Sequence, residues 1–246
     1  MKKILLIFSF IIFSTLVYAG SNDKINKSGF INKHVKLIDN FEINDPKNKI
    51  ILIYNHGQDE NDTVKECTWV SMLRNHASLI DLEVNGKKIM VYNLCSNHLM
   101  GDMSNKKDWW YLKPQPKIYE GKHLLDKRVE LNLKLVEKFI DAGVPRKQVF
   151  VTGRSCGGLT TLLFMSRYPE KVGGGISYMQ ACFGKLSHNY KVKKVGAEKA
   201  IAKFRKKNQG PHDLRLKMND EIKNNLKDTV LAFTHPKDKY EGLLSD

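Results

Sequence analysis

The stretch Val149-Phe150-Val151-Thr152-Gly153-Arg154-Ser155-Cys156-Gly157-Gly158 joins a run of branched and aromatic residues to the pattern G-x-S-x-G. An apolar segment, residues 159–168, follows it and is closed by Pro169. A buried strand, a sharp turn and a helix are therefore expected in immediate succession. Small residues are needed beside the serine because larger side chains would collide with neighbouring strands. We expect the hydroxyl of Ser155 to project from this turn.

Apolar runs bounded by polar turns occur at residues 50–54 and 89–94, as expected of strands that are buried on both faces of a sheet. Residues 175–179 and 229–233 are expected to form two further strands. Helical spacing of apolar residues lies between them, at residues 63–80 and 124–142. The alternation predicts an α/β fold: a mainly parallel, doubly wound sheet with helices on both faces and ligands at the carboxyl ends of the strands.

Two segments fit this alternation less well. Residues 34–43 alternate loosely and are expected to form an early antiparallel strand after a polar leader at residues 21–33. Residues 96–122 are polar and aromatic and contain two prolines, which indicates a long surface loop. Its Trp109-Trp110-Tyr111 could form a stacking wall for a sugar or an aromatic ligand, or could anchor the loop by burial.

The first 19 residues have the three regions of a secretory signal: Lys2 and Lys3, an apolar run, and small residues ending at Ala19. We expect cleavage after Ala19 and a secreted or periplasmic location; an uncleaved membrane anchor is the alternative. The remaining residues 20–246 suit one large domain with a basic insertion at about residues 183–228. No later segment is long and apolar enough to span a bilayer.

The chain is strongly basic, with a formal net charge of +15 that becomes +13 when Lys2 and Lys3 leave with the signal. Such a charge favours acidic surfaces, anionic polymers and anionic lipid head groups without defining one partner. No basic motif with interleaved aromatic residues accompanies the lysines, so specific nucleic-acid binding is not expected. The composition does not indicate an oligomeric state.

Four cysteines remain after signal removal: Cys67, Cys95, Cys156 and Cys182. An even number in an oxidising compartment permits two disulfides, whose pairing the spacing does not reveal. Buried free thiols are the alternative, because a domain of this size folds without covalent links. The spacings do not resemble those of a zinc site, and we expect neither a metal nor another cofactor.

The opening stretch, continued to Tyr168-Pro169-Glu170, resembles the nucleophile region of the α/β-hydrolase superfamily. Dienelactone hydrolases and polyhydroxybutyrate-depolymerase-like or feruloyl esterases are the branches it resembles most. The resemblance implies a catalytic triad of Ser, Asp or Glu, and His in chain order, with Ser155 as the nucleophile. It thereby implies a serine hydrolase, foremost a carboxylic ester hydrolase that forms an acyl-enzyme. The substrate stays open because this fold supports many reactions.

A second polar turn, His56-Gly57-Gln58, follows the strand at residues 50–54. Hydrolases of this architecture provide one amide of an oxyanion hole from this position, which makes the backbone of Gln58 the candidate. Its partner is the amide of Cys156, directly after the nucleophile. We interpret His56 as a packing or hydrogen-bonding residue rather than as the base, because it precedes the serine in the chain.

Asp238 follows the last predicted strand, in a segment that resembles the loop presenting the triad acid in those enzymes. Residues 239–246 contain no histidine, so we expect the base beyond Asp246 and a domain that is incomplete at its C-terminal end. His235 is a weaker alternative, since acid and base would have to approach Ser155 from one short loop. Two histidines in the basic insertion are weaker still: His188 and His212.

The missing base favours a second hypothesis from another class. In it the protein is a catalytically inactive, hydrolase-shaped binding protein that uses its cleft and basic surface to hold an acidic or polymeric partner. The two hypotheses differ in whether Ser155 reacts.

Overall fold

The computed structural model describes residues 24–39, 42–57, 67–96, 124–182, 191–207, 209–227 and 229–234. The predicted signal peptide and nearly all of the predicted loop at residues 96–122 lie outside these ranges. The site predictions for Gln58, His235 and Asp238 lie outside them as well.

Seven of the described strands form one mixed sheet, in the order β2-β6-β3-β7-β8-β9, with β5 also paired to β6. β6, β3, β7, β8 and β9 are parallel neighbours, whereas β2 and β5 run antiparallel to β6. The predicted fold class, a mainly parallel α/β sheet, is confirmed. The strands are β2 Gly29–Ile31, β3 Lys49–Asn55, β5 Glu83–Val84, β6 Lys87–Leu94, β7 Val149–Arg154, β8 Gly174–Tyr178 and β9 Val230–Phe233.

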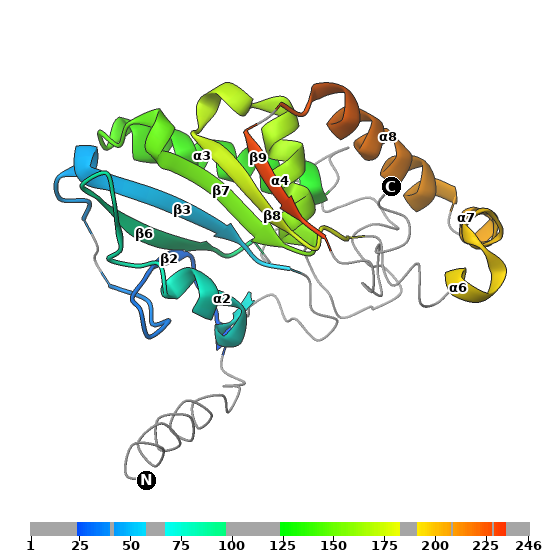
Figure 1. Ribbon diagram of the computed structural model, residues 1–246, viewed down its shortest axis with the longest axis horizontal. Coiled ribbons are helices and arrows are strands. Elements are labelled where there is room, and N and C mark those ends of the chain that lie inside the picture. The colour runs from blue at the N-terminus through cyan, green and yellow to red at the C-terminus, as the bar shows by residue number, and fades with distance from the viewer. Residues whose placement is uncertain are drawn as a thin grey trace, which may run out of the picture.

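Helices cover both faces of this sheet, as Figure 1 shows. The helices are α2 Val70–Ala77, α3 Leu124–Asp141, α4 Cys156–Arg167, α6 Val192–Val195, α7 Ala197–Lys207 and α8 Gln209–Asn225. Short 3-10 turns precede β3, β7 and β8: Pro46–Asn48, Arg146–Gln148 and Pro169–Lys171.

The alternation of side chains along β3 explains why two helical layers are needed. Ile51 and Ile53 are buried in the larger core with residues of α3 and α4. Leu52 and Tyr54 point to the other face and are buried in a smaller core with residues of α2. A strand that is apolar on both faces must be covered twice, which is why it appears in the sequence as a continuous apolar run.

The prediction of an antiparallel strand at residues 34–43 is wrong. The antiparallel strand is β2, inside the segment that looked like a polar leader, and it pairs with β6. A turn follows it, because the side chain of Asn32 accepts hydrogen bonds from the amides of His34 and Lys36. Val35 therefore has a positive φ of 59°, which interrupts an extended conformation.

The helix predicted at residues 63–80 is shorter than expected. α2 begins at Val70, and Thr68–Trp69 form the short strand β4, which pairs with β1 at Lys24–Ile25. Cys67 is held in this extended segment by its disulfide with Cys95 and by a 3.0 Å hydrogen bond from its amide to the carbonyl of Ile25. The helical spacing at its start was misleading because these tertiary links determine the local conformation.

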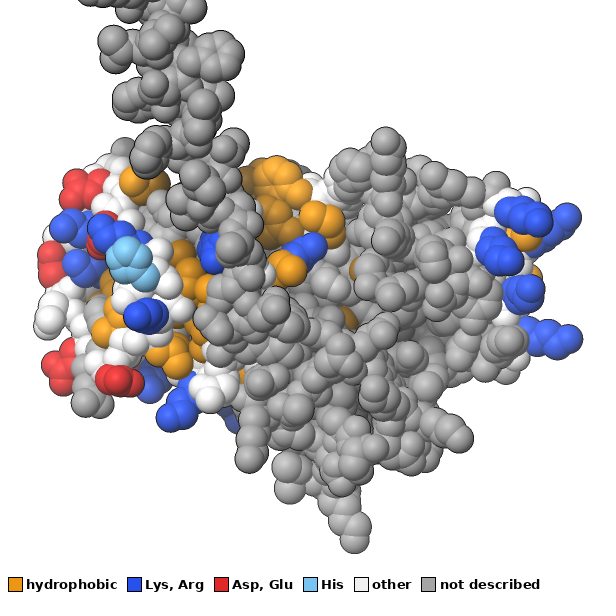
Figure 2. All heavy atoms as spheres, turned by 90° about the horizontal axis from the view of Figure 1, so that it is seen from below, with side chains coloured by type: hydrophobic (Ala, Val, Ile, Leu, Met, Phe, Trp, Pro, Cys, Tyr) orange, Lys and Arg blue, Asp and Glu red, His pale blue; other side chains and the backbone are white. Residues whose placement is uncertain are grey.

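The lysine-rich segment is helical where the structure describes it. α8 packs on α4, with Met218 buried in the main core, and α7 packs on α8. Figure 2 shows Lys and Arg side chains gathered at the end of the molecule where α6 and α7 lie. None of the described helices combines the length and the hydropathy that crossing a bilayer requires.

Candidate active site

Ser155 occupies the turn between β7 and α4 in an unusual backbone conformation. Its φ of 55° and ψ of −122° lie outside the regions that residues with a Cβ normally adopt. The surroundings hold it there: its amide donates to the carbonyl of Tyr178 at 3.0 Å, and its carbonyl accepts from the amides of Leu159 and Ala181. Such strain persists only where neighbouring structure enforces it, and it is typical of functional turns.

The glycines around Ser155 let three backbones pack directly on one another. A Cβ on Gly157 would overlap the carbonyl of Asn55 at the end of β3, and a Cβ on Gly153 would overlap the backbone of Gly157. A Cβ on Gly158 would lie 2.9 Å from the carbonyl of Tyr178 at the end of β8. The small residues are thus needed because the turn is inserted between the ends of β3 and β8.

The turn after β3 lies directly beside the candidate nucleophile. A Cβ built on Gly57 would be 3.2 Å from the Cβ of Ser155. Cys156 is the first residue of α4, which places its amide at the positive end of the helix dipole. Gln58, the predicted second donor, lies outside the described residues, so its amide stays a prediction. The geometry brings Ser155, Cys156 and Gly57 to one point at the carboxyl ends of the strands.

His56 is buried, and its ring nitrogens contact Gly57 and Ser96. The amide and hydroxyl of Ser96 lie 3.2 Å and 2.9 Å from Nε2, and the amide can only donate. Nδ1 then carries the proton and donates to the carbonyl of Gly57 at 2.6 Å. This arrangement fits the interpretation of His56 as a residue that shapes its own turn.

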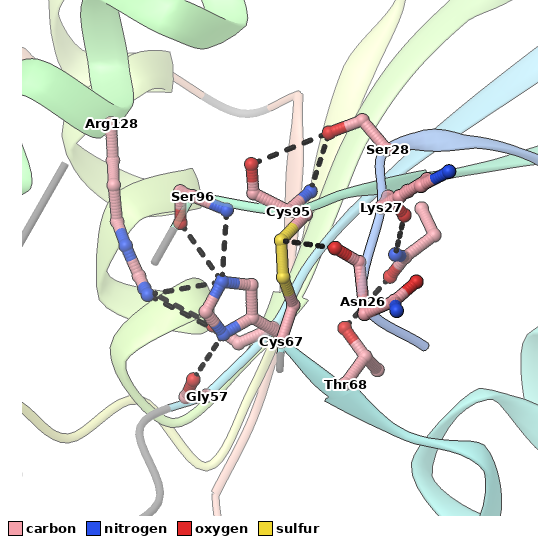
Figure 3. The surroundings of a disulfide bond; sticks show 11 residues. Asn26, Lys27, Ser28, Gly57, Cys67, Thr68, Cys95, Ser96 and Arg128 are labelled. Atoms are coloured by element: carbon pink, nitrogen blue, oxygen red, sulfur yellow. Dashed lines mark hydrogen bonds between the residues drawn. A yellow bond between two sulfur atoms is a disulfide. The ribbon is translucent and has the colours of Figure 1, made fainter. Parts of the chain in front are cut away.

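A buried arginine approaches the same turn from α3. The guanidinium of Arg128 donates to the carbonyl of His56 at 3.1 Å, and its side chain is only 1% exposed. Arg128 comes from α3 and Ser96 from the end of β6, and Figure 3 shows the two side chains approaching one imidazole ring from different sides, the ring whose bond partners are those of His56. Sequence reasoning missed both residues, because it considered the contacts of this turn only through its neighbours along the chain.

Two buried asparagines join β3 to α3 next to this turn. Each amide nitrogen donates to the oxygen of the other, at 3.0 Å from Asn55 to Asn132 and at 2.8 Å in the reverse direction. Asn55 also donates to the carbonyl of Thr152 on β7 at 3.2 Å. The sequence held a signal for the α3 side of this contact. Arg128 and Asn132 are polar residues four positions apart within the apolar pattern of the helix.

We expect Asn132→Leu to lower the free energy of unfolding by about 1–3 kcal/mol, because it leaves the buried amide oxygen of Asn55 without its donor. Urea denaturation checks this. The matched control is the double variant Asn55→Leu with Asn132→Leu, which removes both polar groups and should recover part of the loss. A double variant less stable than both single variants would contradict the paired-amide explanation.

The four cysteines form two disulfides, Cys67–Cys95 and Cys156–Cys182, with Cα separations of 5.3 Å and 4.4 Å. The second one links the residue after Ser155 to the loop after β8. That loop contains Ala181, whose carbonyl accepts a 3.0 Å hydrogen bond from the hydroxyl of Ser155. The disulfide therefore fixes the hydrogen-bond acceptor and the candidate nucleophile relative to each other.

His76 is a second buried histidine, and it lies beneath the site on the α2 side of the sheet. Its Nε2 is 3.1 Å from the hydroxyl of Thr152, and its ring packs on Tyr54 and Tyr178. Burial lowers the pKa of His76 to about 4, so the ring is neutral at pH 7. These contacts indicate a packing role.

The structure does not place the rest of the predicted triad. Asp238, His235 and His188 lie outside the described residues, as does the side chain of His212. Within the described part of the chain, the hydroxyl of Ser155 has the carbonyl of Ala181 as its hydrogen-bond partner. The acid and the base therefore stay predictions, and no group of described residues has the composition of a metal site.

Solved structures are similar at low identity. A phospholipase/carboxylesterase from Dyadobacter fermentans is 17% identical, with 67% of this chain and 62% of that chain covered and a TM-score of 0.37. A glucuronoyl esterase from Sporotrichum thermophile is 11% identical, with 81% and 53% covered and a TM-score of 0.47. A glycosylation-associated protein complex (Gap123) from Streptococcus agalactiae is 10% identical, with 87% and 37% covered and a TM-score of 0.43.

The chain thus spans between 37% and 62% of the length of these three solved chains. No family model and no curated protein matches it. No conclusion about activity follows from likenesses at this level. The fold type rests on the chain's own geometry: parallel neighbours β3, β7 and β8, helices on both faces, and a positive-φ serine between β7 and α4, which is the α/β-hydrolase arrangement.

Proposed function

We propose that the protein is a serine hydrolase that cleaves carboxylic esters through an acyl-enzyme on Ser155. The observation that supports this most is the strained conformation of Ser155 at the carboxyl end of a central parallel strand. A serine that only linked a strand to a helix would have no need of a positive φ or of backbone packing so close that a Cβ at Gly153, Gly157 or Gly158 would overlap it.

The proposed reaction has two steps. The oxygen of Ser155 attacks the ester carbonyl, a base takes the hydroxyl proton, and the alcohol leaves with that proton. Water then adds to the acyl-enzyme, releases the acid and restores the hydroxyl. The amides of Gln58 and Cys156 hold the oxyanion in both steps, and Asp238 orients a histidine that acts as the base.

The bond from Ser155 to Ala181 describes the resting state of this mechanism. The hydroxyl donates its proton to a carbonyl, which cannot act as a base. For attack the hydroxyl must turn away from Ala181 and donate to the histidine instead. The Cys156–Cys182 disulfide keeps the rest of the turn fixed while this rotation occurs.

We propose that the enzyme is secreted or periplasmic. Two features support this location: the signal-like pattern of residues 1–19 and the pairing of the four cysteines as disulfides. Disulfides persist in oxidising compartments and are rare in the cytosol.

In a catalytically complete form of the protein, we expect a fluorophosphonate probe to label Ser155 and no other serine, because the strained turn exposes this hydroxyl beside the proposed oxyanion donors. Digestion and mass spectrometry of the labelled protein identify the modified residue. Ser155→Ala is the control and should show no label. A folded protein that stays unlabelled would favour the second candidate, a binding protein that does not turn over its ligand, and a label elsewhere would refute the assignment of Ser155.

A further inference from the structure

Nearly half of the net charge of the chain is concentrated in 17 residues. Residues 191–207 contain eight Lys or Arg and one acidic residue, Glu198, a net charge of +7 out of +15. Six of the basic side chains are exposed: Lys191, Lys194, Lys199, Lys203, Arg205 and Lys206. We call these six residues the basic face. A charge density of this size exceeds what solubility requires of one short segment.

The basic face is held by folded structure. α6 and α7 are joined at Gly196, whose φ of 85° makes the sharp turn between them, and α7 packs on α8 with Ala200 buried. α8 is in turn attached to α4. The guanidinium of Arg167 on α4 donates to both carboxylate oxygens of Glu221 on α8, at 2.5 Å and 2.9 Å.

This attachment engages Glu221, one of three acidic residues in α8, whereas Asp213 and Asp220 are exposed. Glu221 is engaged by Arg167, which further contacts Asp126 of α3 at 2.8 Å. The hydrogen bond with Glu221 contributes most to raising the pKa of Arg167. α6 and α7 are thus connected through α8 to α4, the helix that begins at Cys156, directly after Ser155.

The basic face lies at the functional end of the molecule. In Figure 1, α6 and α7 lie beyond the end of the sheet toward which β7 and β8 point, which is the end that carries Ser155. Figure 2 shows their blue side chains gathered at that end with apolar side chains between them. A partner held there would be presented to the same end of the sheet as the nucleophile.

Two exposed apolar side chains distinguish between classes of anionic partner. Val195 in α6 is 37% exposed and Leu216 in α8 is 45% exposed, both close to lysines in the chain. Apolar side chains among cations suit a lipid surface, where they enter the head-group region while the cations meet lipid phosphates. A polysaccharide or a nucleic acid would offer such aliphatic side chains little to contact. Proteins bind these polymers mainly through aromatic stacking and hydrogen bonds.

We propose that the basic face docks the protein on a membrane surface rich in anionic phospholipid, with Val195, which directly follows Lys194, at the lipid boundary. The binding is peripheral and depends on salt, because it consists largely of interactions between exposed lysines and lipid phosphates. It requires no reaction at Ser155, so it holds independently of the proposed esterase activity.

Vesicle sedimentation tests this docking. The purified protein is mixed with vesicles of phosphatidylcholine alone or with 30% phosphatidylglycerol, at low and at physiological salt, and the bound fraction is measured. The neutral vesicles account for any contribution from the apolar N-terminal residues. We expect binding to the anionic vesicles, little to the neutral ones, and weakening with salt.

The triple variant Lys199→Glu, Lys203→Glu and Lys206→Glu should bind the anionic vesicles about 100-fold more weakly, at about fivefold for each lost cation. The matched control changes three exposed lysines at the opposite end of the sheet by the same total charge: Lys36→Glu, Lys47→Glu and Lys147→Glu. It should keep its affinity within about threefold.

Circular dichroism confirms that both variants fold. Equal losses in the two triple variants would show that only net charge matters and would overturn the docking face. The proposal would also be overturned if the triple variant at Lys199, Lys203 and Lys206 bound anionic vesicles as tightly as the native protein. The same holds if the native protein showed no preference for anionic over neutral vesicles. Binding to heparin without binding to vesicles would replace the lipid by an anionic polymer.

Discussion

In a form of the protein that contains the histidine base, replacing Ser155 by alanine should reduce hydrolysis of p-nitrophenyl acetate at least 1,000-fold, on the order found when the nucleophile of a triad is removed. The residual rate comes from the oxyanion donors and from substrate binding, which remain when the hydroxyl is lost. The variant should fold normally, because the backbone bonds that hold the turn, such as that from its amide to the carbonyl of Tyr178, do not involve the side chain.

The matched control is Ser78→Ala, which removes an exposed serine hydroxyl whose 2.8 Å bond is to the carbonyl of Asn75 at the end of α2. Initial rates at several substrate concentrations separate kcat from KM. A loss confined to KM would mean that Ser155 helps to bind substrate without attacking it. Equal turnover by the native protein and Ser155→Ala would rule out the serine mechanism.

All five parallel strands could be predicted from the sequence, the exposed edge strand β9 included. β3, β6 and β7 lie at the centre of the sheet, so their apolar runs are continuous and their predicted positions are confirmed. α3 was predicted to within a residue because its apolar pattern is long and a glycine, Gly143, ends it. These features are local and require no knowledge of distant contacts.

The elements that sequence reasoning misplaced are those that distant contacts determine. β2 is three residues long and exists because β6 offers it hydrogen bonds. The start of α2 is set by a disulfide to Cys95 and by a 2.8 Å bond from Thr68 to Asn93. Neither partner lies nearby in sequence, so local spacing could not reveal either boundary.

The candidate site likewise contains residues that a local motif reveals and residues that only distant contacts bring together. Ser155, Cys156 and the flanking glycines are contiguous, and one motif in one structural context was enough to find them. The groups that hold the turn after β3 come from α3 and from the end of β6, at Arg128, Asn132 and Ser96. No motif joins these residues, and only the fold brings them to Asn55 and His56 at the end of β3.

The second large effect is expected for Gly157→Ala, which should lower the free energy of unfolding by about 3 kcal/mol or more and abolish fluorophosphonate labelling of Ser155. Its Cβ would overlap the carbonyl oxygen and carbon of Asn55, and it would lie 2.8 Å from the carbonyl of His56. These atoms belong to the backbone of a central strand and cannot rotate aside as a side chain could, so β3 and α4 must separate. That movement would carry the oxyanion turn away from the nucleophile.

Gly29→Ala is the matched control, because its Cβ would meet only the Cδ2 atom of Leu37, at 3.1 Å, which a flexible side chain can withdraw. Both variants are compared with the native protein by urea denaturation under oxidising conditions and by the rate of fluorophosphonate labelling. The control should stay within about 1 kcal/mol of the native stability and label at the native rate. If Gly157→Ala behaved like Gly29→Ala in both measurements, α4 could not be packed against the end of β3, and the geometry that places Ser155 beside Gly57 would be wrong.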